Sequence, residues 1–440
     1  MQSLFQQLAD AVCTTVDGVD RTSLFFSAES SDFLRFNHAA VREATHVLQH
    51  YATLSVVRGR RQASATLSLT GRADADTVRL LAQRTQLAGQ LDAIADDPYL
   101  LLPDAVTSTE RNAQGRLPTA AALADAVAQD AAGLDLVGFY AGGTVARGFA
   151  DSRGQRNWHS VQSFLFDWSL YLSADKAVKT RYAGTHWSAE AFTARMQQAR
   201  EELALLQQPY RTLAPGAYRV YLSPVAVADL LSTLSWGGFG LKDVRTGASS
   251  LIRMHSEGAR MASGVTITEA TADGIAPQFQ DDGFVKPESV ALITQGAVAG
   301  TLNAPRSAVE YGVASNGCGA GESPESLHMA PGTLAEADVL QTLGTGVYIT
   351  HLHYLNYSDR QACRMTGMTR FACFWVENGR RVAPISVMRF DDSLLRMFGE
   401  GLVALTNQAE LMPAEDTYGA RQLRSVTAPG AIVDGFRFTL

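Results

Sequence analysis

Tyr218-Arg219-Val220-Tyr221-Leu222-Ser223-Pro224 leads into Val225-Ala226-Val227-Ala228-Asp229-Leu230-Leu231-Ser232-Thr233-Leu234 near the middle of this 440-residue chain, and this stretch is the clearest guide to its fold. Ser followed by Pro is typical of a helix start, with Ser as the N-cap and Pro at the first helical position. Apolar residues recur at helical spacing up to Leu234, and Gly237-Gly238 ends the pattern. The stretch predicts a short β-type run followed by one helix with an apolar face.

The half of the chain before this stretch mixes helical and strand patterns. Apolar spacing and capping residues predict helices over residues 3–15, 74–95, 118–131 and 188–206. Strand character appears in residues 24–26, 33–36, 139–149 and 160–172. Loose alternation over residues 53–67 predicts a hairpin that turns at Arg58-Gly59-Arg60-Arg61.

The half after residue 209 has few helical signals apart from the helix at Ser223. It consists mostly of short β-type runs separated by Gly, Pro, Asn and Asp. Separate helices and hairpin-like strands favour an α+β fold over a doubly wound sheet. We therefore expect an N-terminal α+β domain over residues 1–208. A mainly antiparallel, β-rich and barrel-like C-terminal domain over residues 209–440 then carries the helix at Ser223.

Composition limits the classes of function. The net charge is −7 and no Lys/Arg-rich run is present, which argues against a nucleic-acid partner. No apolar stretch approaches the roughly 20 residues that span a membrane, and the N-terminus does not resemble a signal peptide. The four cysteines have no framework spacing, which favours reduced thiols and a cytoplasmic location.

From residue 218 onward, the order of several short motifs resembles the TldD/PmbA family. The segment 218–231 resembles the strand and helix that carry the zinc motif of that family. Further similar segments are Asp281-Asp282-Gly283 with Ile293-Thr294-Gln295-Gly296, Pro331-Gly332, Gly346-Val347-Tyr348-Ile349-Thr350, Met365-Thr366-Gly367-Met368-Thr369-Arg370 and Val376-Glu377-Asn378-Gly379. Their order and spacing over some two hundred residues make the resemblance fairly specific.

This resemblance implies a two-chain metallopeptidase that degrades or trims unfolded peptides. It implies that one chain, of the TldD type, carries an HExxxH zinc motif on this helix and a cysteine nearer the C-terminus. It implies that the other chain, of the TldE or PmbA type, lacks these ligands. The partner implied here is a TldD-like HExxxH paralogue, or a second copy of this chain, together with an unfolded peptide.

The residues at the motif positions decide which type this chain resembles. The positions of His, Glu and His in the motif hold Ser232, Thr233 and Gly237. Hydrolysis by zinc needs three protein ligands and a carboxylate that takes a proton from water. Ser and Thr are poor zinc ligands, Gly has no side chain, and no cysteine follows Cys373. We therefore expect no catalytic residue and no metal or other cofactor in this chain, with zinc in the partner.

Two other readings stay open. One is a self-sufficient hydrolase with a metal site outside the family pattern, formed by His351, His353 and Cys363. Residues i and i+2 of a strand share a face, so the two histidines could act together if Cys363 folded back toward them. The other reading is a homodimeric peptide-binding module without a protease partner. The sequence does not identify the peptide or the residues that contact it.

Overall fold

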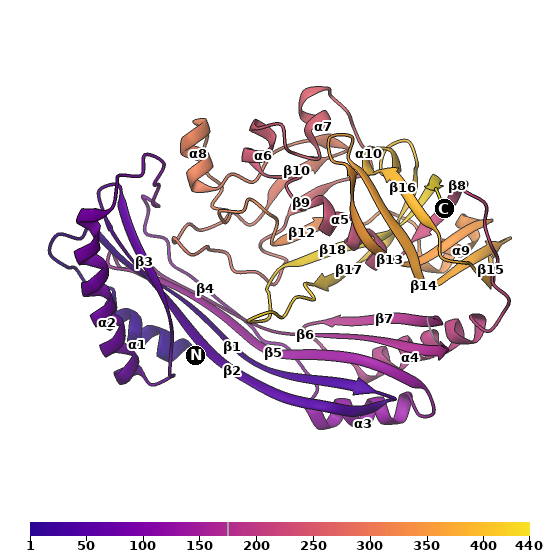
Figure 1. Ribbon diagram of the computed structural model, residues 1–440, viewed down its shortest axis with the longest axis horizontal. Helices are drawn as coiled ribbons and strands as arrows, with labels where there is room; N and C mark the ends of the chain where they lie inside the picture. The colour runs from indigo at the N-terminus through magenta and orange to yellow at the C-terminus, as the bar shows by residue number, and fades with distance from the viewer. Residues whose placement is uncertain (174–175) are drawn as a thin grey trace.

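The computed structural model describes residues 1–173 and 176–440 and contains two large β-sheets with helices around them. Figure 1 shows the first sheet beneath the second, with the N-terminal helices on the far side of the first. The fold is therefore α+β, as predicted. Within the described residues, no helix is long and apolar enough to cross a membrane. None of the four cysteines forms a disulfide.

The first sheet has seven strands in the order β3-β2-β1-β5-β6-β4, with β7 also paired to β6. All pairs are antiparallel except β4 with β6, which is parallel. The strands are β1 (Arg21–Asn37), β2 (Ala40–Arg58), β3 (Arg61–Ser68), β4 (Thr109–Ala113), β5 (Asp135–Asp151), β6 (Arg156–Ser173) and β7 (Lys176–Gly184). The predicted hairpin is confirmed, because Arg58 pairs with Arg61 at the turn between β2 and β3.

The two short strand signals at 24–26 and 33–36 belong to one long strand, β1. Even-numbered residues such as Leu24, Phe26 and Leu34 are buried beneath the helices. The apolar pattern is interrupted where Glu29 and Ser31, on the opposite face, contact Arg421 from the C-terminal half. The sequence pattern therefore shows two short strands in place of one, because the middle of β1 makes polar contacts with Arg421.

Helices cover one face of the first sheet. These are α1 (Gln2–Val12), α2 (Ala73–Gln90), the short 3-10 helix η1 (Leu91–Ala93), α3 (Ala120–Asp130) and α4 (Ala189–Leu205). The Ser188 hydroxyl accepts a hydrogen bond from the amide of Ala191, which confirms the predicted cap of α4. The four predicted N-terminal helices are therefore present, with ends shifted by a few residues.

The second sheet has eleven strands in the order β11-β10-β9-β12-β18-β16-β14-β13-β8, with β15 on β14 and β17 on β18. Its strands are β8 (Gly216–Leu222), β9 (Ile267–Glu269), β10 (Val290–Thr294), β11 (Ala297–Val298), β12 (Ser326–Met329), β13 (Gly346–Asp359), β14 (Arg364–Glu377), β15 (Arg380–Pro384), β16 (Arg389–Ser393), β17 (Leu402–Pro413) and β18 (Ser425–Phe438). The pairs β8–β13 and β12–β18 are parallel. The sheet curls, since β18 also pairs with β8, but it is a large mixed sheet and not a closed barrel.

Helix α5 (Pro224–Leu234) packs against the second sheet and is buried on most sides. The C-terminal half also contains short helices that the sequence did not reveal: α6 (Leu241–Arg245), α7 (Ile252–Ser256), α8 (Pro305–Tyr311), η2 (Glu336–Asp338), α9 (Val339–Leu343) and α10 (Leu394–Met397). They have at most seven residues, too few to produce a helical period.

Each sheet uses residues from one side of position 208 only, although the division at 208/209 itself stays a prediction. The two parts also share apolar contacts. Phe374 and Ala372 of β14 pack into the same cluster as Phe166 and Phe192 of the N-terminal part. The junction between the sheets is therefore partly a packed core and partly the cleft described below.

Candidate functional site

The strand-to-helix stretch adopts the geometry that its residues predict. The Ser223 hydroxyl accepts a hydrogen bond from the amide of Ala226 at 3.2 Å and donates one to the carbonyl oxygen of Thr350 at 2.5 Å. Pro224 occupies the first turn of α5, where its missing N–H costs nothing. These contacts fix the start of α5 against β13, so one face of the helix points toward the first sheet.

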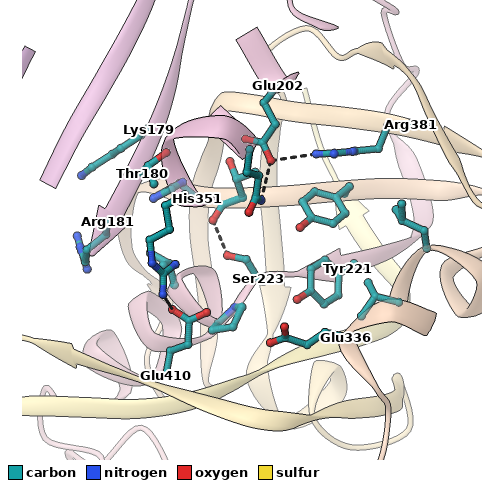
Figure 2. A pocket seen from close by; sticks show the side chains of 18 residues that line it. Lys179, Thr180, Arg181, Glu202, Tyr221, Ser223, Glu336, His351, Arg381 and Glu410 are labelled. Carbon is teal, nitrogen blue, oxygen red and sulfur yellow. Dashed lines mark hydrogen bonds and ion pairs between the residues drawn. The ribbon is translucent and has the colours of Figure 1, made fainter. Parts of the chain in front are cut away.

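Two cavities lie along that face of α5. The first, here called the N-cap cavity, has a volume of about 300 Å³ and is lined at the helix start by Ser223, Pro224 and Val225. Figure 2 shows side chains from both halves of the chain around it. The second, here called the motif cavity, has a volume of about 340 Å³ and is lined by residues further along α5, namely Ala228, Asp229, Ser232, Ser235 and Trp236. Arg181 of β7 lines both cavities, so they are adjacent, and the two are here together called the cleft.

Ion pairs between the two halves of the chain cross this cleft. Arg181 pairs with Asp167 at 3.1 Å and also with Glu415, which lies in the connection between β17 and β18. Arg195 of α4 contacts Glu410 of β17 at 3.5 Å. Arg381 of β15 pairs with Glu202 of α4 at 2.9 Å, and burial raises the pKa of the Glu202 carboxyl. The cleft therefore contains both signs of charge and little excess of either.

Two titratable groups that line the cleft, Asp229 and His351, have shifted pKa values. Burial raises the pKa of the Asp229 carboxyl to about 6, against the opposing effect of Arg181 and Lys179. His351 is 6% exposed and neither of its ring nitrogens has a hydrogen-bond partner. Burial, and then the positive charges of Lys179 and Arg181, hold the pKa of His351 well below its usual range. The imidazole is therefore neutral.

The three motif positions do not share one face. Ser232 is exposed in the motif cavity, whereas Thr233 is buried and its hydroxyl donates to the carbonyl oxygen of Asp229 at 3.0 Å. Gly237 lies beyond the helix end with φ +78°, and a Cβ there would lie 2.7 Å from a carboxylate oxygen of Asp243. These residues do not fit a zinc ion, because only Ser232 presents a side chain to the cavity.

A cysteine ligand nearer the C-terminus would have to reach the same cavity. The C-terminal residues that line it are Met412–Asp416 and Arg424–Val426, and none is cysteine. Cys373 is buried in β14, and burial raises the pKa of its thiol to about 11. Over residues 1–173 and 176–440, no three His, Cys, Asp or Glu side chains are grouped so that they could hold a metal ion.

The alternative site of His351, His353 and Cys363 is not assembled. His353 of β13 lies opposite Met368 of β14, and its ring is 3.1 Å from the guanidinium of Arg370. Cys363 is buried in the turn before β14 and precedes Met368 by five residues. Five strand residues span about 17 Å, so Cys363 is far from His353. Of the three side chains, only His351 lines the cleft. The structure therefore does not bring these three side chains together around one cavity.

Sequence reasoning missed most residues of the cleft, in particular Lys179, Arg181, Glu202, Glu410 and Glu415. They come from β7, α4, β17 and the connection after β17, and they follow no motif. Asp229 was the one visible signal, because it is the only charged residue of α5.

One known protein family and several solved structures resemble this chain. The family model described as the PmbA/TldA metallopeptidase C-terminal domain matches residues 215–440. Among curated proteins, no match was found. A proposed modulator of a DNA gyrase from Thermotoga maritima has a similar structure, with TM-score 0.77 and 13% identity over 100% of both chains.

Two further solved structures share the fold. TldE from Thermococcus kodakarensis gives a TM-score of 0.74 at 12% identity over 100% of both chains. A proposed modulator of DNA gyrase from Bacteroides thetaiotaomicron gives 0.75 at 16% identity, over 100% of this chain and 98% of that one. These identities show the fold alone. Since the family model matches more than half of the chain, the protein belongs to the TldD/PmbA family of metallopeptidase-related proteins.

Proposed function

We propose that this chain is the non-catalytic, TldE-like subunit of a two-chain zinc metallopeptidase that degrades or matures unfolded peptides. In this proposal the chain holds peptide, and a TldD-like HExxxH paralogue supplies zinc and the catalytic carboxylate. The pair would act in the cytoplasm, in keeping with four buried cysteines that form no disulfide.

The observation that carries the proposal is the face of α5 in the motif cavity. A cavity of about 340 Å³ is retained there, while the three motif positions hold an exposed Ser232, a buried Thr233 and a glycine outside the helix. Hydrolysis by zinc requires three ligands and an open position for water. A cavity of this size without those groups supports a role in holding peptide and not in cutting it.

Two open strand edges at the cleft support peptide binding. Among the residues that the structure describes, β7 pairs only with β6, and its residues Lys179, Thr180 and Arg181 line the N-cap cavity. β17 pairs with β18, and from Gln408 to Pro413 its other edge has no backbone hydrogen bond to another described segment. An extended peptide can satisfy such an edge by adding a strand, which gives affinity without sequence preference.

The test is co-expression with the HExxxH paralogue, followed by size-exclusion chromatography and a digestion assay on an unfolded peptide. We expect a heterodimer that cleaves the peptide, whereas neither chain alone matches its rate. A chain that stays monomeric and does not bind the paralogue would overturn the subunit role. A paralogue that is fully active alone would also overturn it. A stable homodimer that binds peptide but not the paralogue would favour the stand-alone binding module.

A further inference from the structure

The N-cap cavity lies at the positive end of a helix. α5 has eleven residues, and its first turn, with Ser223, Pro224 and Val225, lines the cavity. The aligned peptide dipoles of a helix place a partial positive charge at its N-terminus, which favours an anion there. The start of α5 therefore provides one element of an anion site.

Two cations of β7, Lys179 and Arg181, line the same cavity. Both contact the carboxylate of Asp167, at 3.2 and 3.1 Å, and Arg181 also pairs with Glu415. The remaining cations of the cavity are different, because Arg195 and Arg381 each have a glutamate of their own. Lys179 therefore shares its carboxylate partner with a second cation of this cavity.

His351 supplies an unsatisfied polar group to the same cavity. Its ring is 6% exposed, it lines the cavity, and both nitrogens lack partners. A neutral imidazole has one N–H donor and one acceptor, and a buried donor without a partner is costly. Such an orphaned group in a cavity indicates a binding partner that the folded chain does not itself provide.

The chain already brings one carboxylate onto Arg181. Glu415 reaches it from the motif cavity, and this carboxylate is half exposed while Arg181 is 5% exposed. A carboxylate can therefore approach Arg181 from within the cleft. Glu415 competes for Arg181 with any anionic ligand that enters.

We propose that the N-cap cavity binds the free C-terminal carboxylate of a peptide through the N-terminus of α5, His351 and the β7 cations Lys179 and Arg181. The inference rests on the proposed peptide-holding function and adds the end of the peptide that is held. The rest of the peptide runs along α5 toward the motif cavity. Eleven helical residues span about 16 Å, which corresponds to roughly five residues of extended peptide.

The experiment measures binding of three N-terminally fluorescent hexapeptides to the full chain by fluorescence anisotropy. The peptides share an uncharged sequence and end in a free carboxylate, in a carboxamide, or in a carboxamide that follows a glutamate. We expect the free carboxylate to bind about tenfold more tightly than the plain carboxamide, because charge-assisted hydrogen bonds are strong. The glutamate peptide shows whether a side-chain carboxylate can substitute.

Matched variants separate the site from general effects. Lys179→Gln and His351→Gln should abolish the preference for the free carboxylate, whereas His353→Gln, outside the cavity, should keep it. Glu415→Gln should tighten binding of the free carboxylate about threefold, and Asp416→Asn in the same connection should not. A gain of affinity cannot result from misfolding.

The outcomes distinguish this inference from the function on which it rests. Equal binding of the free carboxylate and the plain carboxamide overturns the carboxylate site and leaves peptide binding intact. Equal binding of the free carboxylate and the glutamate peptide also overturns it, because the site would then accept any carboxylate. Failure of all three peptides to bind overturns both proposals.

Discussion

Arg421 donates a hydrogen bond to the carbonyl oxygen of Ser163 at 2.8 Å, although 258 positions separate the two residues. The same guanidinium also contacts Ser31 and Gly143, so a loop of the C-terminal half inserts an arginine into the N-terminal sheet. This loop, between β17 and β18, also carries Glu415 and borders the motif cavity. The hydrogen bonds of Arg421 therefore hold the loop that borders the motif cavity against the first sheet.

Arg421→Ala should destabilise the protein by about 2–4 kcal/mol. The substitution leaves buried acceptors without donors and removes the positive charge that faces Glu29. Urea denaturation measures the change, and limited trypsin digestion should cut the loop faster. Arg424→Ala, at an exposed position of the same loop, is the matched control and should change stability by under about 0.5 kcal/mol. Equal stability of the two variants would contradict the anchoring role.

The purified chain should contain far less than one zinc per molecule. Only Ser232 of the three motif positions faces the motif cavity, and the C-terminal residues that line it contain no cysteine. Elemental analysis of the chain and of its HExxxH paralogue, prepared in the same way, provides the measurement and its positive control. About one tightly held zinc per chain would refute this prediction.

Ser232→His, Thr233→Glu and Gly237→His together should not create a peptidase. The glutamate that replaces Thr233 would be placed in the core, and the histidine that replaces Gly237 would need a left-handed backbone and would meet Asp243. We expect the triple variant to lose several kcal/mol of stability, whereas Ser232→His alone, at an exposed position, should be close to neutral. Thermal unfolding and a peptide-digestion assay test this. Robust cleavage by the triple variant alone is the contrary result.

The stability of the chain should depend on the ionisation of Asp229. Burial raises the pKa of this carboxyl to about 6, so the folded protein holds the proton more tightly than the unfolded chain. The resulting stability is complete below about pH 4, the usual pKa of Asp, and is lost as the pH rises through about 6.

Asp229→Asn should therefore be more stable than the wild type above pH 7, by up to about 3 kcal/mol, and similar to it below pH 4. Unfolding temperatures measured from pH 4 to pH 8 provide the comparison. Asp416→Asn, an exposed carboxylate at the same cavity, should leave the pH profile unchanged. Parallel profiles for the wild type and Asp229→Asn would show that Asp229 is not the responsible group.

Three tyrosines of β13, at positions 348, 354 and 357, differ in their surroundings. Tyr348 lines the N-cap cavity, and the Tyr357 hydroxyl donates to the carbonyl oxygen of Thr233 at 3.1 Å. Only Tyr354 is largely exposed, at 80%. If this half contributes to the dimer, Tyr354→Asn should weaken association without lowering stability, since Asn tolerates the positive φ at this position.

Tyr357→Phe is the matched variant of the same hairpin. It should cost about 1 kcal/mol of stability through the lost hydrogen bonds and leave association unchanged. Analytical ultracentrifugation with the paralogue and thermal unfolding measure the two effects. Association that is insensitive to Tyr354 would remove this face from the interface.

The sequence was sufficient for elements with strong local signals. Ser188 and Ser223 predict two helix caps that the structure contains, and Gly59 marks the hairpin turn between β2 and β3. Local rules work there because a cap or a turn depends on hydrogen bonds between near neighbours. The prediction of two short strands within β1 was wrong because it used local pattern alone. The polar residues at the centre of β1 contact Arg421, which is distant in sequence.

Residue order alone established the α+β class, the helix at Ser223 and the absence of zinc-ligating residue types at Ser232, Thr233 and Gly237. The folded arrangement was needed to show that these positions point in different directions, that Cys363 is far from His351, and that Arg181, Glu415 and His351 border one cleft. Residue types and periodicity are properties of neighbouring positions. A cleft is made by side chains that chain topology brings together, and no local pattern encodes that meeting.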